Sequence, residues 1–186
     1  MNLNSEPILI IGTQRSGSNL LRLMLNQLPE IEAPHPPHIL QTFFPLLNFY
    51  GDLNDRKNFR ALVTDVCRFV NANPVPWQRF FLEPEHVEKK CGKKTLIEIY
   101  RTVYRLKAED KKAKYWCCKS MANVHFIPQI EAEGLRPYYI HLERDGRDVA
   151  ASFKNAIAGE KHVYFLAQQW KNEQELGIEM TSKYAP

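Results

Sequence analysis

The chain has 186 residues and a mass of 21.7 kDa, which suits a single domain. Apolar residues make up 44% of it and charged residues 25%, so it can bury a sizeable core, and disorder of the whole chain is excluded. The formal net charge is +4, and no apolar run approaches the roughly 20 residues that cross a bilayer, so we expect no membrane span.

The first elements are predicted by hydrophobic pattern. Residues 7–12 form a continuous, Ile-rich apolar run, which is typical of a strand buried on both faces. Residues 13–17 are small and polar and predict a loop. From Ser18, leucines recur at three- and four-residue spacing until Pro29 ends the predicted helix. Strand, glycine-containing loop and helix together indicate the front half of a βαβ unit.

The middle of the chain is predicted to be largely helical. Residues 30–33 are compatible with a short strand, and residues 38–50 with a broken helix after a proline-rich segment. Apolar side chains at helical spacing predict helices over 55–72 and 94–107. We therefore expect residues 38–110 to be a helical insertion in the domain.

The second half alternates strands and helices. Strands are predicted at 115–119 and 138–143, and helices at 126–132, 145–157 and 162–177. This order predicts a three-layer α/β/α fold with a parallel sheet, formed by residues 1–186 as one domain. Because only three strands are clear and the chain stops after a helix, we expect the C-terminal part of the fold to be missing.

Charge and cysteine content suggest a compartment and a class of partner. Residues 86–121 hold eleven Lys/Arg against four Asp/Glu, which indicates either an anion-binding patch or a solvated helical surface. The four cysteines, Cys67, Cys91, Cys117 and Cys118, lack the spacing of a metal site or a disulfide framework. No signal peptide is evident in residues 1–6, so we expect reduced thiols, no metal and a cytoplasmic protein.

The first loop has the spacing of a phosphate-binding loop. Gly12 and Gly17 follow a buried strand and precede a helix as G-x-x-x-x-G, where consecutive backbone N–H groups and the helix dipole attract an anion. The Lys and Ser/Thr of a nucleotide triphosphatase are replaced by Ser18 and Asn19, and the cation lies in the loop as Arg15. Magnesium-dependent ATP hydrolysis is therefore disfavoured, whereas a guanidinium suits a terminal oxyanion.

A second anion site is predicted after strand 138–143. Arg144 stands at the carboxyl end of that strand, where open α/β sheets place ligands, and Ser152 lies eight residues further, on the following helix. The two side chains can converge on one phosphate, while Asp145 and Asp148 suit the helix N-terminus. The alternative for Arg144 is an ion pair with a nearby carboxylate.

These two segments resemble the motifs of a known family. The run Thr13-Gln14-Arg15-Ser16-Gly17-Ser18-Asn19-Leu20-Leu21 is similar to the 5′-phosphosulfate loop of sulfotransferases that use 3′-phosphoadenosine 5′-phosphosulfate (PAPS), and Arg144 to Ser152 is similar to their 3′-phosphate motif. The resemblance implies a P-loop-like fold that moves a sulfuryl group to a hydroxyl or amine without a metal. It also implies that Arg15 stabilises charge on the bridging oxygen and the sulfuryl group. The PAPS-binding residues implied are Thr13, Gln14, Arg15, Ser16, Gly17, Ser18, Asn19, Arg144 and Ser152.

The resemblance also implies two places for a general base, which would assist transfer to an alcohol. One is a His after a Lys on a later strand. This chain has Lys119-Ser120-Met121 there, so Met121 cannot take a proton, and Lys119 remains a cation for the sulfuryl group. The other is a carboxylate shortly after the first helix, where this chain has Ala33-Pro34-His35-Pro36-Pro37-His38. His35 fits that place best and His38 stands close behind, although both are also ordinary residues of a proline-rich loop.

Residues 38–110 are expected to build the acceptor pocket, for a small molecule, a glycan or a lipid, and the basic stretch favours an anionic acceptor. The family's C-terminal segment, rich in glycine and lysine, has no match here, in line with a missing C-terminal part. Two other functions stay open: a small-molecule kinase with a degenerate P-loop, which would need magnesium, and a non-catalytic module that binds anions or nucleic acid. The latter would bind with strong salt dependence, and we expect no nucleic-acid partner.

Overall fold

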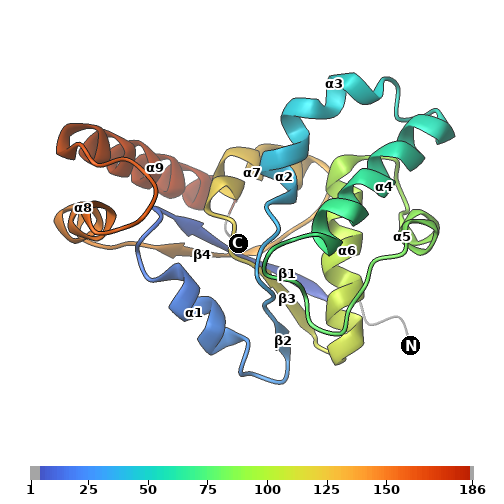
Figure 1. Ribbon diagram of the computed structural model, residues 1–186, viewed down its shortest axis with the longest axis horizontal. Coiled ribbons are helices and arrows are strands. Elements are labelled where there is room, and N and C mark those ends of the chain that lie inside the picture. The colour runs from blue at the N-terminus through green and yellow to red at the C-terminus, as the bar shows by residue number, and fades with distance from the viewer. Residues whose placement is uncertain (1–4, 185–186) are drawn as a thin grey trace.

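The computed structural model, which describes residues 5–184, is built around a sheet of four parallel strands (Figure 1). The strands pair in the order β2 (Ile31–Glu32), β3 (Tyr115–Cys118), β1 (Glu6–Gly12) and β4 (Tyr138–Leu142). The apolar run at the start of the chain therefore becomes an inner strand, with hydrogen-bonded neighbours on both sides. All three clear strands of the prediction are confirmed, and the short strand compatible with residues 30–33 is β2.

Helices cover both faces of this sheet, which confirms the predicted three-layer α/β fold. Ile8 and Ile10 of β1 point to the face covered by α1 (Ser18–Leu25). Leu9 and Ile11 point to the opposite face, whose core includes residues of α6 (Leu96–Lys111), α7 (Ile127–Ala132) and α9 (Val163–Tyr184). This alternation follows from the two-residue repeat of a strand and explains why β1 is apolar throughout.

The predicted helical insertion, residues 38–110, lies over this same face (Figure 1). It consists of α2 (Ile39–Phe43), η1 (Phe44–Leu46), α3 (Leu47–Tyr50), α4 (Arg56–Asn71), α5 (Pro84–Lys90) and all but the last residue of α6. The sequence did not predict α5, because its only fully buried side chain is Val87 and a single apolar position gives no helical repeat. Trp116 of β3 stacks on Tyr104 of α6 beneath this insertion, at a ring-centre distance of 5.0 Å.

The helix ends differ from the prediction where polar side chains interrupt the apolar repeat that predicted the helix. The helix α6 begins at Leu96, because the Thr95 hydroxyl accepts a hydrogen bond from the Glu98 backbone N–H, and it continues through charged residues to Lys111. The last helix, α9, extends beyond the predicted residue 177 to Tyr184. Two further elements are η2 (Met121–Phe126), before α7, and α8 (Gly146–Lys154), which ends three residues before the predicted bound.

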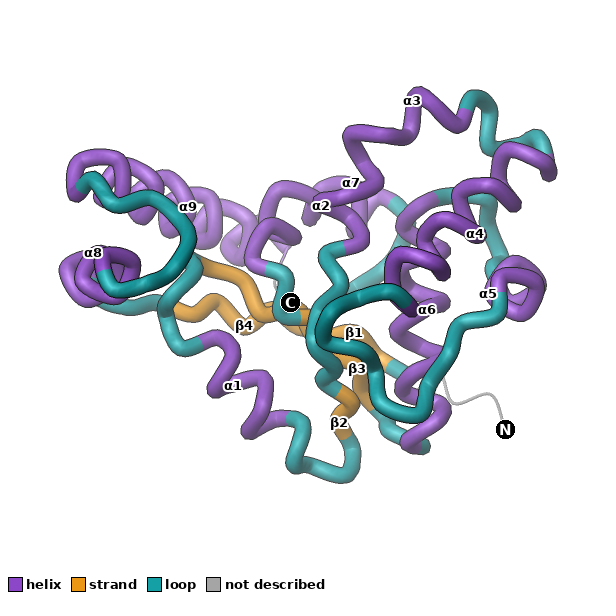
Figure 2. The backbone as a smooth tube through the Cα atoms, viewed as in Figure 1, coloured by secondary structure: helices purple, strands orange, loops and turns teal. Residues whose placement is uncertain are grey.

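The elements at the C-terminal end form a small unit beside β4. A loop joins α8 to α9 at the edge of the molecule (Figure 2), and Val149, Phe153 and Leu166 form a separate apolar cluster between the two helices, with Trp170 packed against it. Among residues 5–184, no helix combines the length and the apolar character that crossing a membrane requires.

The closest backbone approach that shapes the site lies between β1 and β4. Their register pairs Gly12 with Leu142, so both strands end at the same level. A Cβ atom at Gly12 would lie 2.3 Å from the carbonyl oxygen of Leu142, and the φ of Gly12 is +125°. Only glycine accommodates both constraints.

We expect Gly12→Ala to lower the free energy of unfolding by about 2–4 kcal/mol, because it adds a steric clash to an unfavourable φ. Gly134→Ala is the matched control, since Gly134 also has a positive φ of +84° but has no atom within 4 Å of an added Cβ. It should lose only about 1–2 kcal/mol. Urea unfolding of both variants measures the difference, and equal losses would show that the approach to Leu142 is not constraining.

Candidate functional site

A pocket of about 420 Å³ opens at the carboxyl ends of β1, β3 and β4. We call it the anion pocket, because the cations Arg15, Lys119 and Arg144 line it and no carboxylate does so among the described residues. Its other lining residues are Gln14, Gly17, Ser18, Asn19, Leu20, His38, Gln41, Met121, Ala122 and Ser152. Three positive charges without a counter-charge in the wall favour an anionic ligand.

The loop between β1 and α1 has the conformation of an anion cradle. Arg15 has a φ of 69° and Gly17 a φ of 89°, so the chain bends tightly before the N-terminus of α1. The buried Ser16 hydroxyl has no hydrogen-bond partner within residues 5–184. The residues that do line the pocket here, Gly17 and Ser18, stand at the N-terminus of α1, where free backbone N–H groups fit a bound phosphate or sulfate oxygen.

The two predicted anion motifs, which lie far apart in the sequence, meet in this pocket. The Arg15 guanidinium Nε donates a hydrogen bond to the Ser152 hydroxyl at 3.0 Å. Arg144 Nη1 donates to the backbone carbonyl oxygen of Arg15 at 2.9 Å. Arg144 Nε also lies 3.8 Å from the exposed Asp148 carboxylate. This is the ion pair that the sequence analysis gave as the alternative role of Arg144. One ligand can therefore reach both motifs.

Comparison with protein-family models is in line with this geometry. Residues 7–184 match the model described as the sulfotransferase family, which is nearly the whole chain. The chain belongs to the sulfotransferase family. A search of curated proteins found no match.

Not every loop residue predicted for the donor lines the pocket of this sulfotransferase. Thr13 and Ser16 are buried behind the loop. The Thr13 hydroxyl accepts a hydrogen bond from Gln174 Nε2 at 3.0 Å, so it anchors the loop to α9. No pattern in the sequence pointed to Gln174, because it lies within a helix that carries no motif.

The structure separates the two candidate histidines. His38 lines the anion pocket, with its ring Nδ1 at 2.9 Å from the Ser120 hydroxyl. Burial, together with the nearby positive charge of Lys119, lowers the pKa of His38. His35 does not line the pocket, and its buried Nδ1 has no partner in the described chain. Burial lowers the pKa of His35 as well, with contributions from Lys119, Arg22 and His38.

Lys119 and Gln41 complete the wall beside His38. Lys119 follows β3, and burial together with the charge of Arg22 lowers the pKa of its amine. An anion in the pocket would stabilise the charged amine. Gln41 of α2 lines the same wall, although no pattern in the sequence pointed to it. Within residues 5–184, no group of three or more His, Cys, Asp or Glu is arranged to hold a metal ion.

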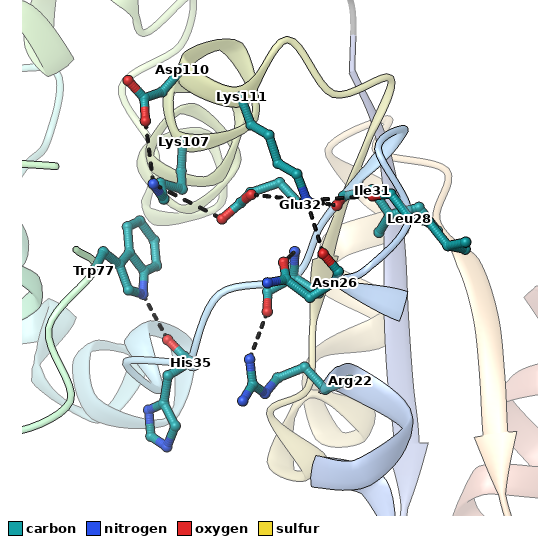
Figure 3. Close-up of polar contacts among 11 residues, drawn as sticks. Arg22, Asn26, Leu28, Ile31, Glu32, His35, Trp77, Lys107, Asp110 and Lys111 are labelled. Carbon is teal, nitrogen blue, oxygen red and sulfur yellow. Dashed lines mark hydrogen bonds and ion pairs between the residues drawn. The ribbon is translucent and has the colours of Figure 1, made fainter. Parts of the chain in front are cut away.

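A polar network holds the segment that leads to His38 (Figure 3). Arg22 Nη1 donates to the Ala33 carbonyl oxygen at 2.7 Å, and the Ala33 N–H donates to Asn26 Oδ1 at 2.7 Å. Trp77 Nε1 donates to the His35 carbonyl oxygen at 2.7 Å. The segment is thus fixed through its backbone to α1 and to the helical insertion, which leaves the histidine rings free for other contacts.

The carboxylate nearest to these histidines in the sequence, Glu32, takes part in the contacts that fix this segment. Glu32 is buried between Lys107 and Lys111, at 4.0 and 3.7 Å. Burial raises the pKa of Glu32, and the two lysines oppose that shift. Lys111 also donates to the Ile31 carbonyl oxygen at 2.7 Å. Glu32 does not line the anion pocket, so its position is that of a structural anchor.

We expect Asn26→Ala to lower the free energy of unfolding by about 1–3 kcal/mol, because it leaves the buried Ala33 N–H without an acceptor. Gln27→Ala is the matched control: its side chain is the exposed neighbour of Asn26 on the same turn. The control should change stability by less than about 0.5 kcal/mol. Thermal or urea unfolding measures both, and a neutral Asn26→Ala would show that the network does not constrain the segment.

Proposed function

We propose that this sulfotransferase uses PAPS as its donor and transfers the sulfuryl group to an acceptor hydroxyl, with His38 as general base. The observation that carries the proposal is the contact of Arg15 with Ser152 and of Arg144 with Arg15. It joins two anion sites in one cation-lined pocket, which suits a nucleotide with anionic groups at both its 5′ and 3′ positions. The four free thiols support a reducing compartment such as the cytoplasm.

The residues present fit this donor. The backbone N–H groups from Gly17 onward, at the N-terminus of α1, would hold the 5′ end, and Arg144 with Ser152 would hold the 3′-phosphate. Arg15 and Lys119 would lie against the sulfuryl end. PAPS, when bound, supplies an activated sulfuryl group on a good leaving phosphate.

The side chains around the pocket then have separate tasks. If His38 Nδ1–H donates to the Ser120 hydroxyl, the other ring nitrogen, Nε2, is unprotonated and can accept a proton. His38 takes the proton of the acceptor hydroxyl as its oxygen bonds to sulfur and the bond from sulfur to the phosphate oxygen breaks. Arg15 stabilises the charge that develops on the departing oxygen, and Lys119 that on the sulfuryl oxygens.

By sequence position His35 is the better fit for the base. We prefer His38 because of where the two side chains lie in the structure. His38 is in the wall of the pocket beside Lys119, and His35 is held away from it by its backbone bond to Trp77. The φ of His38 is 60°, which is uncommon for a residue other than glycine. His38 has this conformation at the N-cap of α2, and its side chain lines the anion pocket.

Donor binding is tested by calorimetric titration with adenosine 3′,5′-bisphosphate, the desulfated product, in the absence of magnesium. We expect clear preference over AMP, which lacks the 3′-phosphate. Arg144→Ala should weaken binding about 10- to 100-fold, because charge-assisted hydrogen bonds are lost. Arg147→Ala is the matched control: Arg147 lies in the same motif but is exposed, pairs with Asp145 and does not line the pocket.

Two results would contradict the assignment of the donor. One is equal affinity for AMP and the bisphosphate, which would remove the role of Arg144 and Ser152. The other is magnesium-dependent binding of ATP with phosphorylated product, which would favour the kinase alternative.

The base is tested by the pH dependence of kcat/KM. A lowered pKa keeps His38 neutral, and hence able to accept a proton, at neutral pH, so activity should fall only below the ordinary histidine pKa of about 6.5. His38→Gln should reduce kcat about 10²- to 10⁴-fold and abolish this acid limb. His35→Gln should keep the limb. If instead the limb disappears only in His35→Gln, the base is His35.

A further inference from the structure

A second pocket, of about 540 Å³, adjoins the anion pocket and shares His38 and Gln41 with it. Its other walls are the end of α2, through Thr42, and the end of α4 with the turn that follows, through Phe69, Ala72 and Asn73. Figure 1 shows this end of α4 approaching α2. The volume lies in the range of small-molecule sites. Its shared wall contains the proposed base, so a molecule lying here would present its reacting group beside the anion pocket.

The second pocket carries no charge of its own. Apart from His38, no titratable side chain lines it among the described residues, and we therefore call it the neutral pocket. It contrasts with the anion pocket, where three cations lie in the wall. A charged acceptor would lose hydration on entering the neutral pocket without gaining a partner there.

One side of the neutral pocket is apolar and held in place. Phe69 is 36% exposed, and its ring packs edge to face with that of the buried Phe43 at a ring-centre distance of 5.5 Å. Pro37 and Pro74 add apolar surface of fixed backbone geometry. The amide of Gln41 and the hydroxyl of Thr42 supply hydrogen-bonding groups without charge. The lining therefore matches a molecule with an apolar body and a few polar atoms.

The basic stretch 86–121 suggested an anionic acceptor, but its side chains lie outside the neutral pocket. Many of its charges are in ion pairs: Lys93 with Glu133, Arg101 with Glu98, Arg105 with Glu109, Lys107 with Asp110, and Lys111 with Glu32. Lys119 lines the anion pocket, and no basic residue of the stretch lines the neutral pocket. The net charge of the segment therefore does not select the acceptor.

We infer that the acceptor is an uncharged small molecule, with its hydroxyl on an apolar body, that occupies the neutral pocket; this inference rests on the function proposed above. The reacting hydroxyl lies at the shared wall, near His38 and Gln41. The apolar body extends along Phe69 toward the turn after α4.

The inference is tested with two probes of one skeleton, 3-phenylpropan-1-ol and 4-(3-hydroxypropyl)benzoate, which differ by a carboxylate. Binding of each is measured by ligand-detected NMR titration, with saturating adenosine 3′,5′-bisphosphate and without it. We expect the neutral alcohol to bind at least about tenfold more tightly, because the carboxylate loses hydration unpaired. Tighter binding of the benzoate, or no binding of the alcohol under both conditions, would overturn the inference.

Ala72→Lys places a charge in the pocket and checks its location. Ala72 is exposed and follows α4. The new ammonium should raise affinity for the benzoate about two- to fivefold, as expected of a solvent-accessible ion pair. Gln27→Lys, which makes the same change in charge at an exposed position two residues after α1, should leave the selectivity unchanged. Equal effects of the two variants would show that the benzoate responds to net charge, and that the probes do not occupy this pocket.

Failure of this inference is distinguishable from failure of the proposed donor. The titration of adenosine 3′,5′-bisphosphate with Arg144→Ala tests the anion pocket alone, whatever the acceptor is. If that titration succeeds and the alcohol does not bind, the acceptor class is wrong and the donor assignment stands. If the bisphosphate does not bind, the proposed function fails, and the measurement without it still reports on the neutral pocket.

Discussion

The contact on which the site depends is the approach of β1 to β4 at Gly12. The absence of a side chain there lets the backbone of Gly12 lie against the Leu142 carbonyl oxygen, where a Cβ atom would be at 2.3 Å. Because the two parallel strands then end side by side, the loop after β1 and the first residue after β4 occupy one edge of the sheet. The hydrogen bond from Arg144 to the Arg15 carbonyl oxygen follows directly from this arrangement. A wider spacing would leave two separate weak anion sites.

The helix α9 fixes both loops from behind. Gln174 binds the Thr13 hydroxyl, and Trp170 Nε1 donates to the Arg144 carbonyl oxygen at 2.9 Å. Gly146 allows this, since a Cβ atom there would lie 3.0 Å from the Trp170 ring. One helix thus holds a residue on each side of the anion pocket through neutral hydrogen bonds, so that none of the pocket's cations is used to anchor the loops to α9. This rigid backing is what preorganised charge stabilisation requires.

The opposite wall is held by a different means. Arg22, Asn26 and Trp77 bind the backbone of residues 33–35, so the short chain between β2 and α2 has a defined course without regular structure of its own. Burial and the charge of Lys119 then favour neutral imidazoles at the end of that segment. His38 and Gln41 form the wall that the cation-lined pocket shares with the uncharged one. In the proposed reaction, the donor would lie on the cationic side of His38 and the acceptor on the uncharged side.

The sequence by itself determined the fold class, the two anion motifs and the type of residue that carries each charge. These rest on local signals: the apolar run of β1, the glycine spacing of the first loop, and the eight-residue step from Arg144 to Ser152. It did not predict α5 or the full length of α9, since their exposed polar residues show no repeat. Only the tertiary structure decided which histidine lines the pocket, that Gln174 and Gln41 belong to the site, and that the basic stretch is paired away from the neutral pocket. The positions of the histidines, Gln174 and Gln41 depend on side chains more than 30 residues apart in the sequence, whose contacts arise when strands and helices pack and leave no pattern along the chain.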